Sequence, residues 1–235
     1  RPMNLFAGVF AELLSIVHIN VMIKEATQIL STALHQRAGG FSPDAPYKKY
    51  NARGPWPVWC ARRRRHFHYA RRLALQYCKI YYNYNRYKHG WRHRCESMLR
   101  AMRRLPRRAP GVVAPTFANP QQPFGRLWHR GRMLRVPLTV DPSCVHRDVA
   151  RANRAHLLLK YRSGRPFQRD PFLREIIAAL QAVQNSCCPG HACQRSDLAH
   201  PLQRRLLALR RRVKPGAVSV APARAVLTST ACLNA

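Results

Sequence analysis

Apolar residues recur every three or four positions in the N-terminal part of the chain, the spacing of one face of an α-helix. The pattern covers residues 5–35 and predicts one core helix, or two helices in tandem. Residues 37–57 are rich in glycine and proline and predict a loop, because both residues interrupt helices. The helical spacing resumes at 59–82 and again in the short basic segment 92–104, which Pro106 ends.

Residues 106–146 break this helical pattern. They are rich in proline and show little periodicity, which predicts a proline-rich linker or an arm that wraps a partner. No window of the chain shows sustained alternation of apolar and polar positions, the pattern of a half-buried strand. We therefore expect a mostly α fold, in which residues 1–105 form a compact helical core domain with a basic second half.

Residues 147–213 are predicted to form a helical, basic C-terminal region. One helix is expected at 148–161, and a second follows Asp170 and Pro171, which suit an N-cap and the first helical position. A third is expected at 201–213. The remaining residues, 214–235, are predicted to be a disordered tail.

The net charge of the chain predicts that this helical protein has a polyanionic partner. The chain carries 42 Lys and Arg against 9 Asp and Glu, a formal net charge of +33. Residues 61–108 alone hold 16 basic residues and one acidic residue, so the basic character begins at Arg62. Nucleic acid is the first polyanion that such a surface suits, and an anionic membrane is the second.

Arginines and tyrosines alternate within this basic block. Guanidinium groups bind phosphates bidentately, and tyrosine rings offer faces on which unpaired bases stack. We therefore expect a non-enzymatic scaffold, or a subunit of a nucleoprotein assembly, that binds RNA or DNA. The predicted nucleic-acid-binding residues are Arg62, Arg63, Arg64, Arg65, Arg71, Arg72, Tyr81, Tyr82, Tyr84, Arg86, Lys88, Trp91, Arg92 and Arg94.

The N-terminal helix offers an enzymatic alternative. His18, Glu25 and Gln28 are seven and three residues apart, so one continuous helix places them on a common face with Met22. A histidine and a glutamate that converge on a pocket can perform acid and base catalysis on a nucleotide or a DNA base. Satisfied structural contacts explain buried polar groups more often, and no Walker loop, GxGxxG turn or HExxH motif is present.

The eight cysteines raise the questions of disulfides and metal. They are few for a disulfide framework in a chain of 235 residues, which favours reduced thiols and a reducing compartment. The segment CCPGHAC offers four zinc ligands, but they are crowded into one loop instead of two separated pairs. We expect no cofactor, with zinc as the alternative. Its ligands would be Cys187, Cys188, His191 and Cys193.

The apolar run at residues 5–23 is long enough to raise the possibility of a membrane-spanning helix. Glu12, His18 and Asn20 interrupt it, and a spanning helix needs about 20 residues nearly free of such groups. We therefore expect no transmembrane segment.

Several blocks in the first hundred residues resemble a known family. The sequence contains MIKEATQILSTALH at 22–35, APYK at 45–48, VW at 58–59 and LALQYCKIYYNYNRYKHGWRHRCE at 73–96. These blocks resemble a family of small, uncharacterised helical proteins found mainly in bacteriophage genomes, with a Lys-Met-Ile-x-Glu-x-x-Gln pattern. The resemblance spans about residues 3–100 and implies a role in DNA metabolism or modification.

Carried over position by position, the family pattern fits this chain in part. The matching residues are His18, Met22, Ile23, Glu25 and Gln28. The acidic and lysine positions of the pattern fall on Ile16, Val17 and Val21. If those polar residues make a site in the family, half of it is absent here, which favours a basic scaffold over an enzyme.

Overall fold

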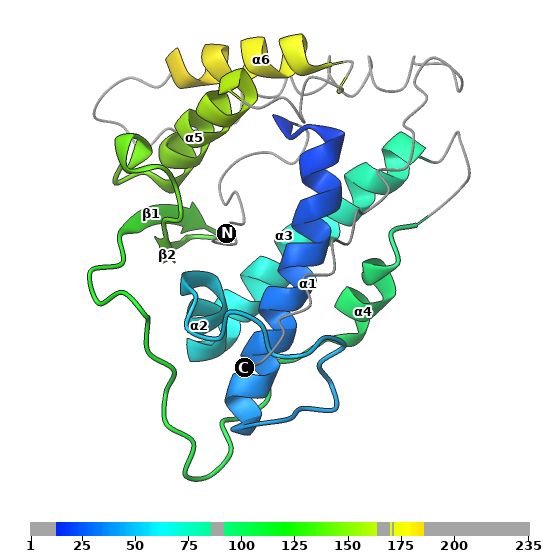
Figure 1. The fold of residues 1–235 in the computed structure, drawn as a ribbon, viewed down its shortest axis with the longest axis vertical. Coiled ribbons are helices and arrows are strands. Elements are labelled where there is room, and N and C mark those ends of the chain that lie inside the picture. Colours follow the sequence, from blue (N-terminus) through cyan, green and yellow to red (C-terminus); the bar gives the residue numbers. More distant parts are fainter. Residues whose placement is uncertain (1–12, 86–91, 164–169, 171, 186–235) are drawn as a thin grey trace, which may run out of the picture.

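The fold is mostly α, as the periodicity predicts. The computed structural model describes residues 13–85, 92–163, 170 and 172–185 (Figure 1). In these residues 57% are helical, in six helices, and one small two-stranded sheet is present. The predicted helix at 201–213, the predicted tail and the four predicted zinc ligands lie outside the described residues.

Helix α1 (Ile16–Ala38) is the central element of the fold (Figure 1). It begins after Ser15, whose side chain accepts a hydrogen bond from the backbone N–H of His18 at 3.2 Å. It ends at Gly39, whose φ of +79° is the left-handed conformation that favours glycine at a C-cap. Most residues of the helix are themselves buried, so its near neutrality suits an element enclosed by protein.

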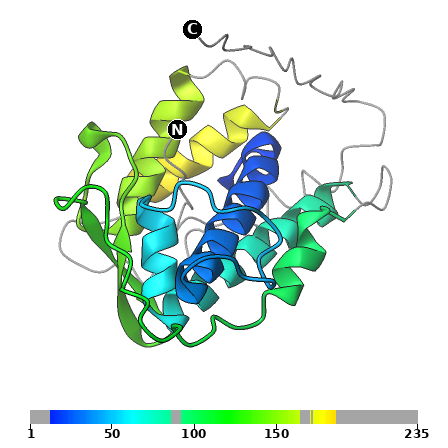
Figure 2. The same ribbon diagram turned by 60° about the horizontal axis from the view of Figure 1, so that its bottom comes forward.

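Two helices replace the single helix predicted at residues 59–82. Helix α2 (Pro55–Arg62) starts earlier, with proline at its first position, and α3 (Arg64–Asn85) follows directly. Arg63 separates them because its backbone is extended, with φ −143° and ψ 140°. Helix α3 packs along α1, and α4 (Cys95–Ala101) lies on the opposite side of α1 from the sheet in both views (Figures 1 and 2).

The proline-rich segment contains a β-hairpin that the sequence analysis did not predict. Strands β1 (Phe124–His129) and β2 (Arg132–Pro137) pair antiparallel through a two-residue turn. Both turn residues have positive φ, 50° for Arg130 and 72° for Gly131, which matches the twist of a tight hairpin. Trp59 of α2 donates from its indole nitrogen to the carbonyl oxygen of Arg135 at 2.6 Å and so holds β2 against the helices.

The C-terminal part contributes a 3-10 helix, η2 (Pro142–Cys144), and helices α5 (Val149–Ser163) and α6 (Leu173–Asn185). Asp170 is buried and caps two helices. One carboxylate oxygen accepts from the N–H of Phe172 at 2.9 Å, and the other accepts from the N–H of Ile16 at 2.8 Å. Asp170 was predicted as the N-cap, and α6 begins three residues later, at Leu173; its two contacts join the segment before α6 to the start of α1.

One buried apolar cluster contains side chains from α1, α2, α3, β2, α5 and α6. The four cysteines of the described residues are buried within the fold and form no disulfide; they are Cys60, Cys78, Cys95 and Cys144. None of the described helices is both long and apolar enough to cross a membrane.

Candidate nucleic-acid interface

The exposed side of α3 is basic along its first half. Phe67, Ala70 and Ala74 of this helix are buried in the apolar cluster. Arg64, Arg65 and Arg72 lie on the other side and are exposed, while His68 and Arg71 are half-buried there. The helical period therefore separates the apolar and basic residues of this block onto two faces.

The basic side chains of this surface lie close enough to repel one another. Burial lowers the pKa of His68, and the charges of Arg71, Arg72 and Arg64 lower it further. Burial likewise lowers the pKa of Arg71, with contributions from Arg103, Arg100 and Arg72. Because arginine stays protonated at all physiological pH values, this repulsion is present in the folded protein.

The same repulsion extends the surface beyond α3. Burial lowers the pKa of Arg37 at the end of α1, and Arg108 and Arg64 lower it further. Burial lowers the pKa of His129 in β1, followed by Arg130 and Arg72. We call this group of basic residues the arginine face. It consists of Arg37, Arg64, Arg71, Arg72, Arg100, Arg103, Arg108, Arg130 and His68.

Acidic side chains do little to neutralise this surface. Within the described residues the ion pairs are those of Glu96, which contacts Arg92 at 3.0 Å and Arg100 at 2.6 Å. Two further guanidinium nitrogens, Nε of Arg37 and Nε of Arg108, are buried without a hydrogen-bond partner in the described part of the chain. A buried donor without an acceptor is costly.

Some of the predicted phosphate contacts are instead used within the protein. Arg71 donates to the carbonyl oxygens of Leu99 at 2.6 Å and Arg100 at 3.1 Å, which satisfies the C-terminal end of α4. Arg62 donates to Pro115 at 3.4 Å, and its guanidinium lies 4.6 Å from the centre of the Phe117 ring.

Four of the predicted arginines around the start of α3 remain open to a ligand. Their side chains form no hydrogen bond or ion pair with any residue that the structure describes, and all four are exposed: Arg63, Arg64, Arg65 and Arg72.

The predicted stacking tyrosines lie at the other end of α3. Tyr81 is 17 residues after Arg64, which is about 25 Å along a helix. The Tyr81 ring packs edge-on against His93 at 5.1 Å, and Arg92 lies 4.9 Å from the centre of the Tyr82 ring. Tyr84 is half-buried against the apolar cluster. The structure therefore does not bring these rings to the arginine face.

The remaining predicted contacts divide into two groups. Arg92 and Arg94 are exposed beside α4, away from the start of α3. Arg86, Lys88 and Trp91 lie outside the described residues.

His18 is held as a structural residue. It is 5% exposed, and its Nδ1 lies 3.0 Å from the hydroxyl of Tyr161. The same hydroxyl accepts the N–H of Ser15 at 2.8 Å, so Tyr161 holds both His18 and the residue before α1. Burial lowers the pKa of His18 to about 3, with smaller contributions from the charges of Lys160 and His156. The imidazole is therefore neutral at physiological pH.

Glu25 and Gln28 share the helix with His18 but do not meet it. Along α1 they lie about 10 Å and about 15 Å from His18, and both are half-buried. Direct proton transfer needs heavy atoms about 3 Å apart. The structure thus places the three predicted catalytic candidates on one helix without bringing His18 and Glu25 into one site.

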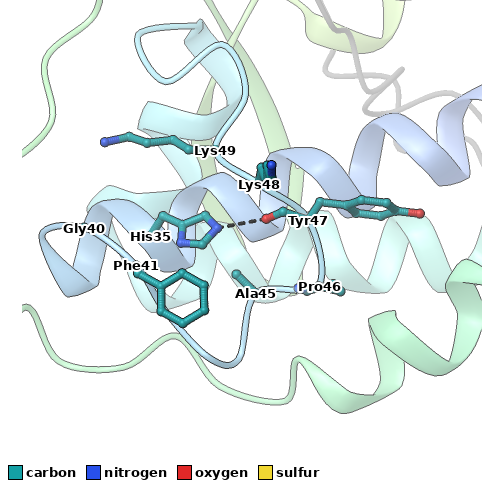
Figure 3. A pocket seen from close by; sticks show the side chains of 8 residues that line it. All are labelled: His35, Gly40, Phe41, Ala45, Pro46, Tyr47, Lys48 and Lys49. Atoms are coloured by element: carbon teal, nitrogen blue, oxygen red, sulfur yellow. Dashed lines mark hydrogen bonds between the residues drawn. The ribbon is translucent and has the colours of Figure 1, made fainter.

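A hollow of about 430 Å³ lies beside the C-terminal part of α1 (Figure 3). His35 shapes it, because its Nδ1 accepts the N–H of Ser42 at 3.0 Å and its Nε2 donates to the carbonyl oxygen of Tyr47 at 2.8 Å. Both ring nitrogens are therefore engaged, and His35 fixes the loop instead of facing a ligand. Its lining residues are His35, Gly40, Phe41, Ala45, Pro46, Tyr47, Lys48 and Lys49.

The described residues contain no group of three or more His, Cys, Asp or Glu side chains arranged to hold a metal ion. Comparisons of the chain with models of protein families, with curated proteins and with solved structures found no match. The resemblance to the bacteriophage family stays a prediction, and a functional proposal has to rest on the geometry of the chain itself.

Several members of the arginine face were not among the predicted residues. His68 could have been predicted from the helical spacing, because it lies one helical turn from Arg64 and from Arg71. Arg103 and Arg130 could not have been predicted in this way, because loops and a hairpin bring them to α3 from distant parts of the chain.

Proposed function

We propose that this protein binds nucleic acid through the arginine face and acts as a non-enzymatic scaffold. The observation that carries the proposal is the group of exposed arginines on α3 around His68, which repel one another and whose ion pairs within the described residues involve Glu96 alone. A folded protein holds such charges together at a cost in stability. Phosphate groups remove that cost by placing negative charge between the guanidinium groups.

The chemistry of arginine supports a phosphate ligand in particular. The planar guanidinium presents donors in a fixed geometry that matches a phosphate bidentately. Arg63, Arg64, Arg65 and Arg72 are exposed without a partner among the described residues, so binding breaks no contact that they make there. The surface extends over α3, the segment after α4 and the hairpin turn, and this length suits a chain of phosphates better than a single anion.

The location of the bound polyanion is tested with two charge-matched double variants. Arg64→Gln with Arg72→Gln removes two charges from the arginine face, and Arg162→Gln with Arg174→Gln removes two exposed charges from α5 and α6. For a single-stranded oligonucleotide, the slope of log affinity against log salt should fall by about 1.4 in the first variant, because two phosphate contacts are lost. Affinity is measured by fluorescence anisotropy over a salt series.

The control variant should keep a slope close to that of the wild-type protein. Equal changes in the two variants would contradict the proposal, because total charge and not the arginine face would then govern binding. Phosphatidylserine vesicles serve as a competitor in the same assay. If they displace the oligonucleotide at equal phosphate concentration, an anionic membrane is the better ligand and the proposal fails.

A further inference from the structure

The hairpin has one face turned toward the helices and one face turned away from them. Successive side chains of a strand point to opposite faces, and Leu134 and Val136 of β2 are buried. The other face is mixed, with aromatic residues, arginines and a methionine. From the strand register it consists of Phe124, Arg126 and Trp128 on β1 and of Met133 and Arg135 on β2, and Pro137 at its far end is buried. We call it the outer face of the hairpin.

Two arginines stand directly opposite each other on this face. The register pairs Arg126 with Arg135, and both side chains are exposed. Directly opposed side chains have Cβ atoms about 5 Å apart, and like charges at such positions destabilise a sheet. In the described part of the chain neither arginine forms an ion pair, and the nearby carboxylate of Asp148 instead accepts the N–H of Arg151 at 3.0 Å.

An exposed tryptophan follows the arginine pair toward the turn. Trp128 is 52% exposed and Met133, its cross-strand partner, is 44% exposed. A large aromatic ring beside two uncompensated guanidinium groups is the arrangement that single-stranded nucleic-acid sites use, with a base stacked on the ring and phosphates on the cations.

The outer face is continuous with the basic block at the start of α3. Arg62 lies over the ring of Phe117 at 4.6 Å, and Phe117 packs edge-on against Phe124 at 5.3 Å. Arg135 lies over Phe124 at 5.5 Å. Two packed rings therefore join Arg62 at the end of α2 to Arg135 on β2, and Arg130 in the hairpin turn belongs to the arginine face.

We propose that the outer face of the hairpin binds an unpaired nucleotide, with its base stacked on Trp128 and its phosphate held between Arg126 and Arg135. The inference rests on the proposed function and narrows it, because stacking on Trp128 requires a base that is not paired in a duplex. The preferred partner is then a single-stranded stretch of RNA or DNA that crosses the hairpin and continues over the arginine face.

Two substitutions at one position separate stacking from apolar contact. Trp128→Phe keeps an aromatic face, and Trp128→Leu keeps an apolar side chain without one. For a single-stranded oligonucleotide we expect Trp128→Leu to weaken binding by about 5- to 100-fold and Trp128→Phe to retain most of the affinity. Neither change should alter the salt slope, because no charge is removed. A duplex of the same sequence should bind all three proteins alike.

A third variant tests the arginine pair through two opposite effects. Arg126→Gln should raise the melting temperature of the free protein, because it removes the like-charge contact with Arg135. It should also weaken oligonucleotide binding and lower the salt slope by about 0.7. A lower melting temperature with unchanged affinity would overturn the role of the pair.

The outcomes distinguish this inference from the function on which it rests. If the arginine face controls the salt slope while Trp128→Leu binds as the wild-type protein does, only the inference about the hairpin fails. If Trp128→Leu and Trp128→Phe lose equal affinity for the oligonucleotide, stacking of a base on Trp128 is excluded and the inference about the hairpin also fails. If no oligonucleotide binds, the proposed function itself fails. Melting temperatures of the Trp128 variants near that of the wild-type protein show that the fold is retained.

Discussion

Replacement of Trp59 by alanine is expected to lower the free energy of unfolding by about 3–5 kcal/mol, the usual cost of removing a large core aromatic residue. Trp59 is buried in α2 and stacks on His66 with ring centres 4.0 Å apart. Trp56 and Tyr69 pack edge-on against it at 5.4 and 6.1 Å. Its indole N–H also donates to Arg135, so the same side chain joins α2, α3 and β2.

The matched variant is Trp59→Phe, measured beside Trp59→Ala by urea unfolding. Phenylalanine fills much of the space but cannot donate a hydrogen bond, so the part-buried carbonyl of Arg135 loses its donor at a cost of about 0.5–1.5 kcal/mol. We expect the destabilisation to rise from the wild-type protein through Trp59→Phe to Trp59→Ala. A loss below about 1 kcal/mol in Trp59→Ala would show that this side chain does not hold the hairpin to the helices.

The second large effect is a loss of stability in acid. Burial lowers the pKa of His18 to about 3 and that of His66 to about 4, from an ordinary value of 6.5. Arginine charges lower the pKa of His66 further, against the raising effect of its hydrogen bond to Trp59. Burial likewise lowers the pKa of His93 and of His156 to about 4.

The sign of the effect follows from which state binds more protons. Between pH 6.5 and about 4 the unfolded chain protonates these histidines and the folded chain does not, so unfolding is favoured as pH falls. Stability is fully present above pH 6.5 and is lost toward pH 4. From pH 7 to pH 5, His18 alone contributes a loss of about 2 kcal/mol.

His18→Gln isolates one of these contributions. Glutamine does not titrate, and its side-chain oxygen can accept the hydroxyl proton of Tyr161. Unfolding free energies measured between pH 7 and pH 5 should fall less steeply in this variant, by about one proton, or about 1.4 kcal/mol per pH unit in the middle of the window. An unchanged pH slope would show that His18 is protonated in the folded protein.

Helical spacing and capping residues predicted those helices whose formation depends on residues close together in the sequence. The three- and four-residue spacing predicted a helix at residues 5–35, and α1 runs from Ile16 to Ala38. Asp170, predicted as an N-cap, lies three residues before α6 begins. The sequence did not predict the break between α2 and α3 at Arg63. Any residue can adopt the extended backbone found there, and no glycine or proline marks the position.

The hairpin was missed for a physical reason that bears on function. Strand prediction depends on alternation, with one apolar face and one polar face. In β1, Phe124 and Trp128 share a face with Arg126, so the exposed face is itself partly aromatic. The mixture that hides the strand from a periodicity analysis is the same mixture from which we infer a nucleotide-binding surface.

The candidate site could be predicted only in part. The arginines at the start of α3 were identified from their clustering, but closeness in sequence wrongly suggested that they and the tyrosines act together. About 25 Å of helix separates Arg64 from Tyr81. His18 is buried against the hydroxyl of Tyr161, which gives it a structural role within α1.

The pKa of His68, measured by NMR in the free protein and in its complex with a single-stranded oligonucleotide, tests the central claim most directly. Burial and the charges of Arg64, Arg71 and Arg72 hold this pKa below 6.5 in the free protein. Phosphates bound to those arginines would oppose their repulsion, so we predict that the pKa rises in the complex. The same pKa in the saturated complex would place the nucleic acid elsewhere and contradict the account.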